Sequence, residues 1–173
     1  MRNEEKVVSN NWRKNEKAAN RNPIILRENN YVYIDKTRFV WELIDRGKFY
    51  FMSRPRRFGK SLIIGTFEEL FKGSKRIFEE LYIHEKWDWS KTNPVIHLDF
   101  AEIGYKTSNM LENSLLDFVN SEASKYEVEL TNRALPSRFA QLIEKLHEKA
   151  EERVVILVDE YDKPLIDNLI NKE

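Results

Sequence analysis

The stretch FMSRPRRFGKSL at residues 51–62 decides how this sequence is interpreted. Its second half, FGKS, matches the end of the phosphate-binding pattern G-x-x-x-x-G-K-[ST]. Counting back from Gly59 places Arg54 where the pattern has its first glycine, and Pro55 follows. Glycine there allows a tight turn with positive φ, whereas proline fixes φ near about −65°. The motif alone leaves two interpretations open: a phosphate loop with an altered entrance, or a basic turn that contains Gly-Lys-Ser.

The residues around the loop favour the first interpretation. The aromatic-rich segment KFYFMS (48–53) is a strand candidate, and a helix is expected after Gly59, with one apolar face from Leu62 to Phe71. Backbone N–H groups at the start of such a helix bind phosphate oxygens. Lys60 would then reach the β- and γ-phosphates, and the Ser61 hydroxyl would ligate Mg²⁺. Two further arginines, Arg56 and Arg57, either add contacts to phosphates or are solvated.

A second motif lies near the end of the chain. The β-branched run in RVVILVDE (153–160) is typical of a strand covered on both faces. A carboxylate at the end of a core strand can hold Mg²⁺, which predicts that role for Asp159. Glu160 would orient or deprotonate the attacking water. The alternative is an ordinary acidic turn after a strand.

The rest of the chain alternates strand and helix signals. Strands are expected at YVYID (31–35) and PVIHLDF (94–100). Helices are expected after Asp35, ending at Gly47, and around Leu111–Val119 and Phe139–Leu146. This order predicts an α/β fold with a parallel sheet flanked by helices. The strand at 94–100 lies between the two motifs and a glutamate follows Asp159, which is the pattern of additional-strand P-loop ATPases.

Composition narrows the class of protein. The 173 residues carry 29 basic and 29 acidic side chains, so no overall charge attracts nucleic acid or an anionic membrane. The chain contains no cysteine, and its polar start has no apolar signal segment. No aliphatic run approaches the length of a membrane span. We therefore expect a cytoplasmic protein with a polar N-terminal arm at residues 1–27 and one domain at residues 28–173.

The strings RPRRFGKS, PVIHLDF and VVILVDEYDKP resemble the predicted AAA-ATPase-like family of bacteria and archaea. In that family an arginine replaces the first glycine of the loop, and the ATPase is often joined to a PD-(D/E)XK nuclease-like domain. The resemblance implies that ATP and Mg²⁺ bind at Arg57, Phe58, Gly59, Lys60, Ser61, Asp159 and Glu160. Nothing in the sequence resembles the nuclease half or the later strands, so we expect an N-terminal fragment truncated after the second motif. Such a fragment would be unstable or completed by a partner.

Three functions follow as expectations. The first is Mg²⁺-dependent ATP binding, with hydrolysis that needs the missing C-terminal part. The second is a non-hydrolysing module that uses the nucleotide pocket for interaction. The third is a nucleic-acid-binding accessory to a nuclease, which would use Arg54, Arg56 and Arg57. Asp99, which shares a strand face with His97, either assists the Mg²⁺ site or makes a structural hydrogen bond.

Overall fold

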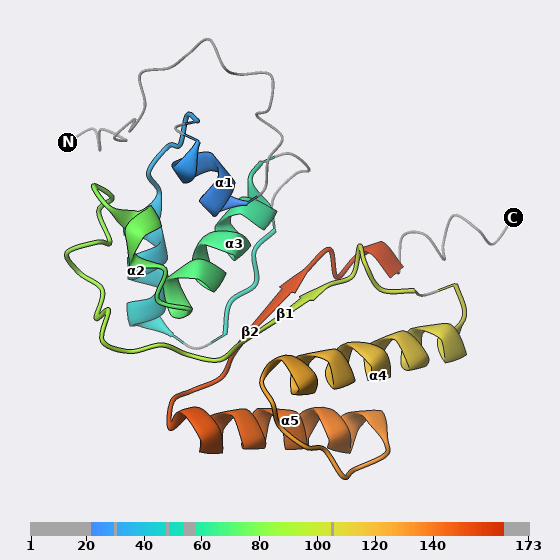
Figure 1. Ribbon diagram of the computed structural model, residues 1–173. Helices are drawn as coiled ribbons and strands as arrows, with labels where there is room; N and C mark the ends of the chain where they lie inside the picture. Colours follow the sequence, from blue (N-terminus) through green and yellow to red (C-terminus); the bar gives the residue numbers. More distant parts are fainter. Residues whose placement is uncertain (1–21, 30, 48, 54–57, 105, 165–173) are drawn as a thin grey trace, which may run out of the picture. The chain divides into compact units, whose positions relative to one another are not determined.

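The computed structural model describes residues 22–29, 31–47, 49–53, 58–104 and 106–164 (Figure 1). The chain divides into two compact units, Met1–Thr92 and Asn93–Glu173, which are described separately. In the first unit the elements are α1 (Pro23–Glu28), α2 (Thr37–Arg46), α3 (Lys60–Phe71) and the short 3₁₀ helix η2 (Lys75–Phe78). In the second unit they are β1 (Val95–Asp99), α4 (Ser108–Lys125), α5 (Leu135–Ala150) and β2 (Val155–Asp159).

Helix α1 belongs to the structured part of the first unit. Asn22 caps its start by accepting a hydrogen bond from the Ile24 N–H at 2.8 Å, and a proline occupies the first turn. Leu26 is buried in the core, and Arg27 donates to the Ile77 carbonyl at 2.8 Å. Residues 23–27, which the sequence analysis places in the polar arm, therefore lie within this packed unit, while residues 1–21 lie outside the described residues.

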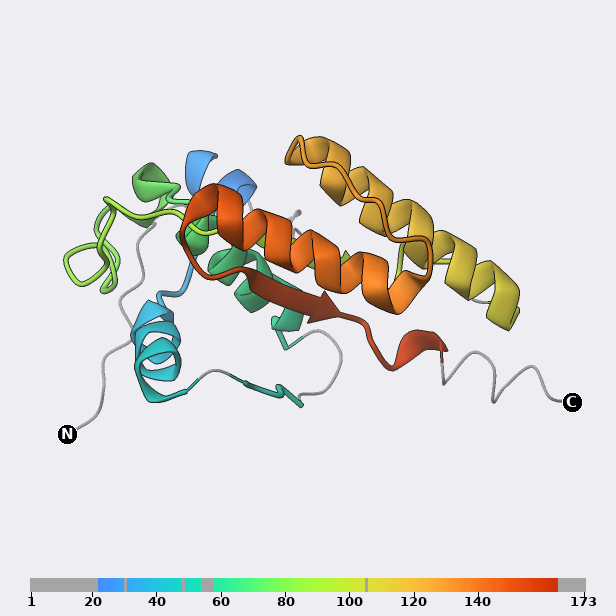
Figure 2. The same cartoon turned by 90° about the horizontal axis from the view of Figure 1, so that it is seen from below.

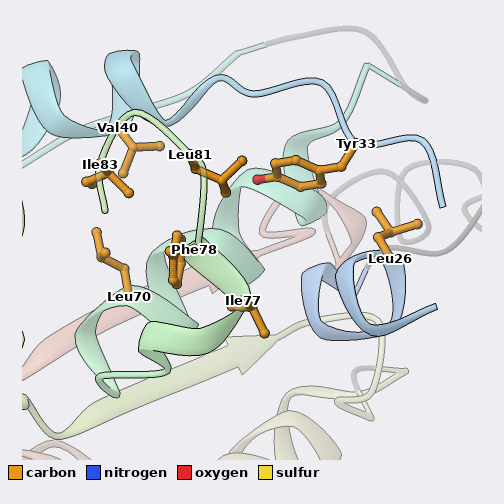
Figure 3. Close-up of a cluster of buried hydrophobic side chains, with 8 residues drawn as sticks. All are labelled: Leu26, Tyr33, Val40, Leu70, Ile77, Phe78, Leu81 and Ile83. Carbon is orange, nitrogen blue, oxygen red and sulfur yellow. The ribbon is translucent and has the colours of Figure 1, made fainter. Parts of the chain in front are cut away.

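The core of the first unit joins the three helices to the segment that follows η2. Figure 3 shows its buried side chains, which are Leu26, Tyr33, Val40, Leu70, Ile77, Phe78, Leu81 and Ile83. Trp87 and Trp89 pack against this cluster, and Trp89 donates its indole N–H to the His84 carbonyl at 2.7 Å. Helices α2 and α3 confirm the predicted helices, and Gly73 after α3 takes a positive φ of 78°.

Two predicted strands do not form in the described part of this unit. The segment at residues 31–35 contains only a single-residue bridge at Ile34. Residues 49–53 have no regular secondary structure, and the Phe49 and Phe51 side chains are 95% and 71% exposed. The prediction of strands at 31–35 and 48–53 is therefore wrong for the residues described, because an apolar run becomes a strand only where a neighbouring strand accepts its hydrogen bonds.

The second unit is a parallel strand pair connected by two helices. β1 and β2 pair in parallel, in register from Val95↔Val155 to Asp99↔Asp159, which is compatible with the predicted α/β fold with a parallel sheet. Helices α4 and α5 run side by side along the strands in both views (Figures 1 and 2). Their contact faces bury Ile96 in a second apolar cluster with Val119, Ala123, Leu142 and Leu146. The unit is thus a β–α–α–β arrangement, in which helices connect the parallel strands.

The two edges of this sheet differ. The Tyr126 hydroxyl accepts from the Val95 N–H at 2.8 Å and donates to the Val95 carbonyl at 2.9 Å. On β2, by contrast, the side chains of Ile156 and Val158 are 44% and 42% exposed. The prediction that this strand is covered on both faces is therefore wrong for the described residues, because the face that carries Ile156 and Val158 is partly exposed. Among the helices described, none is both long and apolar enough to span a membrane.

Candidate functional site

The start of α3 presents the phosphate-binding part of the predicted loop. Gly59 is the N-cap residue and has φ 77° and ψ 21°, in the left-handed region. A Cβ built on this residue would meet no protein atom within 4 Å, so the backbone conformation and not crowding by protein explains the glycine. Among the described residues no side chain caps the helix, and its first turn has no acidic residue, which leaves the positive end of the helix available to an anion.

Lys60 and Ser61 form the first turn of α3, as predicted, and both are half-buried. Within the described residues, the Lys60 ammonium group forms no ion pair, so its charge is not neutralised there. The Phe58 ring just before the helix is 64% exposed. The predicted contacts of Arg54, Arg56 and Arg57 fall on residues 54–57, which lie outside the described part of the chain.

A buried hydrogen-bond chain fixes the position of α3. The Thr66 hydroxyl donates to the Leu62 carbonyl at 2.8 Å, which leaves its oxygen to accept from the Tyr33 hydroxyl at 3.3 Å. Burial raises the pKa of Tyr33 above its ordinary value of 10.0, and the hydrogen bond with Thr66 opposes that effect. Tyr33 therefore stays protonated at neutral pH and holds one side of the helix that carries Lys60.

A second polar network joins α2 to the segment after η2. The Asp35 carboxylate accepts from the Thr37 N–H at 2.8 Å, the Thr37 hydroxyl at 2.7 Å and the Tyr82 N–H at 2.8 Å. The Thr37 hydroxyl, which is buried, also accepts from the Ile83 N–H at 3.2 Å. Asp35 thus supports the start of the helix that was expected after it, although the N-cap residue itself is Lys36. We call this network the Asp35–Thr37 clip.

The second group of predicted site residues follows β2. Asp159 is the last residue of the strand and only 4% exposed, and its Oδ1 accepts from the Glu160 N–H at 2.9 Å. Glu160 takes a φ of 51°, a left-handed conformation that costs a non-glycine residue about 1 kcal/mol or more. The Glu160 carbonyl then accepts from the Lys163 N–H at 2.9 Å. This turn ends the strand and places two consecutive carboxylates at its C-terminal end.

Asp99 occupies the matching position on β1. It is the register partner of Asp159, and its Oδ1 accepts from the Ala101 N–H at 2.7 Å. One of the two roles expected for Asp99, a structural hydrogen bond, is therefore present. His97 lies two residues earlier on the same face of β1, as expected from strand alternation. The structure thus makes Asp99 and Asp159 register partners at one end of the strand pair, and Glu160 follows Asp159 in the chain.

This group suits a hydrated magnesium ion better than a site made by protein alone. Within the described residues, neither Asp99 nor Asp159 forms an ion pair, and their oxygens are hard ligands of the kind that Mg²⁺ prefers. The described residues contain no group of three or more His, Cys, Asp or Glu side chains that could hold a metal. Mg²⁺ is typically bound by one or two carboxylates, with water and substrate phosphates as its other ligands. The donor set at Asp159 fits that mode.

Comparison with known proteins gives the context of these residues. The model of a family described as "Predicted AAA-ATPase" matches residues 24–173. A protein of Azotobacter chroococcum mcd 1, described as "Uncharacterized protein in vnfD 5'region", is 43% identical over 143 residues, which cover 83% of this chain and 28% of that protein. The chain thus corresponds to less than a third of the length of this relative. No solved structure matches the chain.

Proposed function

Because the chain belongs to the predicted AAA-ATPase family, we propose that it binds ATP together with Mg²⁺ through a variant P-loop. The observation that carries this proposal is the start of α3. There a left-handed Gly59 leads into an uncapped helix whose first residues are Lys60 and Ser61. The uncapped N–H groups at the positive end of the helix dipole attract a triphosphate, and so does the Lys60 ammonium group, which forms no ion pair within the described residues.

We assign each residue a role in this proposal. The backbone from Arg57 to Gly59 surrounds the phosphates, Lys60 contacts the β- and γ-phosphates, and Ser61 supplies a hydroxyl to the magnesium ion. Asp159 is the proposed carboxylate ligand of magnesium, because a buried carboxylate at the C-terminal end of a strand is a suitable ligand. The ion, when bound, neutralises charge on the phosphates.

Glu160 is the proposed catalytic base if the bound ATP is hydrolysed. Its left-handed backbone follows directly after Asp159, and backbone strain of this kind often marks functional residues. A carboxylate one residue after the magnesium ligand is suited to accept the proton of the attacking water. We propose P-loop geometry of the additional-strand type for the whole nucleotide-binding fold. Hydrolysis, a nuclease-like partner domain and a cytoplasmic location are part of the same proposal.

The test is a direct measurement of ATP affinity in the full chain by calorimetry, in the presence of Mg²⁺. Lys60→Ala should remove a charge-assisted contact of roughly 1.5–3 kcal/mol, which is on the order of tenfold or more in ATP affinity. Lys86→Ala is a matched control, because it removes an exposed lysine from the same unit. Equal ATP affinity in the Lys60 and Lys86 variants would refute the P-loop assignment. Steady-state phosphate release then separates hydrolysis from binding alone.

A further inference from the structure

We propose that Asp99 is a positioning residue of the magnesium site, which acts with Asp159 to hold the water ligands of the ion. This inference rests on the proposed function and adds a residue that lies outside both sequence motifs. Its starting point is the register of the sheet, in which Asp99 and Asp159 are direct partners at the C-terminal ends of β1 and β2. Mg²⁺ gives up its water reluctantly, so groups that orient its water contribute to binding.

The backbone brings the two carboxylates close together. Neighbouring strands lie about 4.8 Å apart, and register partners in a parallel pair project from the same face of the sheet. Alternation along β1 places Asp99 on the face opposite Ile96, which packs against the helices. Asp159 shares that face through the register. The helices α4 and α5 therefore do not cover the side of the sheet on which the two carboxylates lie.

The hydrogen bonds of the two carboxylates leave matching acceptor capacity. In each residue Oδ1 accepts one backbone N–H, from Ala101 to Asp99 at 2.7 Å and from Glu160 to Asp159 at 2.9 Å. Among the described residues, neither Oδ2 forms a hydrogen bond or an ion pair. Two like charges on directly opposite residues of a sheet destabilise it. A cation between or beside the two carboxylates relieves that repulsion, which would explain why Asp99 and Asp159 lie opposite each other.

A purely structural role for Asp99 makes a different prediction. In that case Asp99 serves only to accept the hydrogen bond from the Ala101 N–H, which closes the turn after β1. Asparagine keeps an oxygen acceptor for this bond and removes only the charge. Asp99→Asn therefore separates the two roles, because the structural role is preserved and the magnesium role is lost.

The experiment measures ATP affinity by calorimetry in magnesium and in EDTA, for the full wild-type chain and for Asp99→Asn. We expect unchanged ATP affinity in EDTA and roughly tenfold weaker affinity in magnesium, the scale of outer-shell partners of metal sites. The thermal midpoint of Asp99→Asn in EDTA should also rise by a few degrees, because the like-charge pair is gone. Asp117→Asn, which removes an exposed carboxylate on α4, should change neither quantity.

The outcomes separate the two proposals. If the wild-type chain does not bind ATP in magnesium, the proposed function fails and the role of Asp99 fails with it. If the wild-type chain binds ATP and Asp99→Asn binds equally well in magnesium, only the role of Asp99 is overturned. A lower thermal midpoint of Asp99→Asn in EDTA would also overturn it, in favour of the structural role. Should Asp99→Asn not fold, Asp99→Ser, whose hydroxyl can accept the Ala101 N–H, is held to the same criteria.

Discussion

The Asp35–Thr37 clip makes a quantitative prediction about the unit that carries the P-loop helix. Thr37→Val removes the hydroxyl from a side chain that is 1% exposed. The Ile83 N–H then loses its acceptor in a fully buried place, and Asp35 loses one of its three donors. An unsatisfied buried donor costs about 1–3 kcal/mol, and the lost hydrogen bond to a charged group adds to it. We expect Thr37→Val to lower the free energy of unfolding by about 2–3 kcal/mol.

Tryptophan fluorescence during urea unfolding can measure this loss in the right unit. All four tryptophans precede residue 93, so fluorescence reports the first unit, whereas far-UV circular dichroism reports both units. With a urea dependence of about 2 kcal/mol per molar, the fluorescence midpoint should fall by roughly 1 M. Thr37→Ser keeps the hydroxyl and should recover most of this loss, and the exposed Thr92→Val should have no effect. Equal midpoints for Thr37→Val and Thr92→Val would show that the clip contributes nothing to stability.

Three further predictions concern single side chains. Because the pKa of Tyr33 is raised in the folded state, its contribution to stability is complete below about pH 10 and is lost as the pH rises through the folded-state pKa. The urea midpoint of Tyr33→Phe should therefore fall less steeply at high pH than that of the wild-type chain. Glu160→Gln should leave ATP binding intact and lower ATP turnover by about 10²-fold or more. Glu151→Gln, at another glutamate with a left-handed backbone, should not lower turnover, and equal turnover in the two variants would exclude Glu160 as the base. Tyr126→Phe leaves the buried Val95 N–H and carbonyl without the phenol and should cost about 1–3 kcal/mol; an unchanged circular dichroism midpoint would contradict this.

The elements that sequence periodicity predicted well are those whose partners lie close along the chain. Helices α2 to α5 each carry an apolar stripe that packs within its own unit, and β1 and β2 lie within the segments predicted as strands at 94–100 and 153–160. The segment at residues 49–53 has an equally strong apolar pattern but no strand geometry, because strand formation depends on a neighbour that the pattern does not specify. The start of helix α1 could have been predicted from the sequence, since Asn22 followed by Pro23 is a helix-start signal.

At the candidate site, the residue types could be predicted from the sequence, but their contacts could not. FGKS and VDE give the residues, and the structure adds the left-handed backbone at Gly59 and Glu160. The exact register of Asp99 with Asp159 depends on the pairing of two strands separated by two helices, so no local pattern could fix it. The Asp35–Thr37 clip was likewise hidden, because its partners at Tyr82 and Ile83 are more than 40 residues away.

The contrast between the two sheet borders has a consequence for how this sheet can be extended. In a parallel ladder alternate residues direct their backbone groups to opposite sides, so the Ile156 and Val158 amides and carbonyls point away from β1. The Tyr126 phenol occupies the equivalent groups of Val95 and closes the opposite border to an incoming strand. Within the described residues, the border of β2 is therefore the one that can accept an added strand, because its outward backbone groups lie beside exposed apolar side chains. The same border, left uncovered, is where non-native edge-to-edge association would begin.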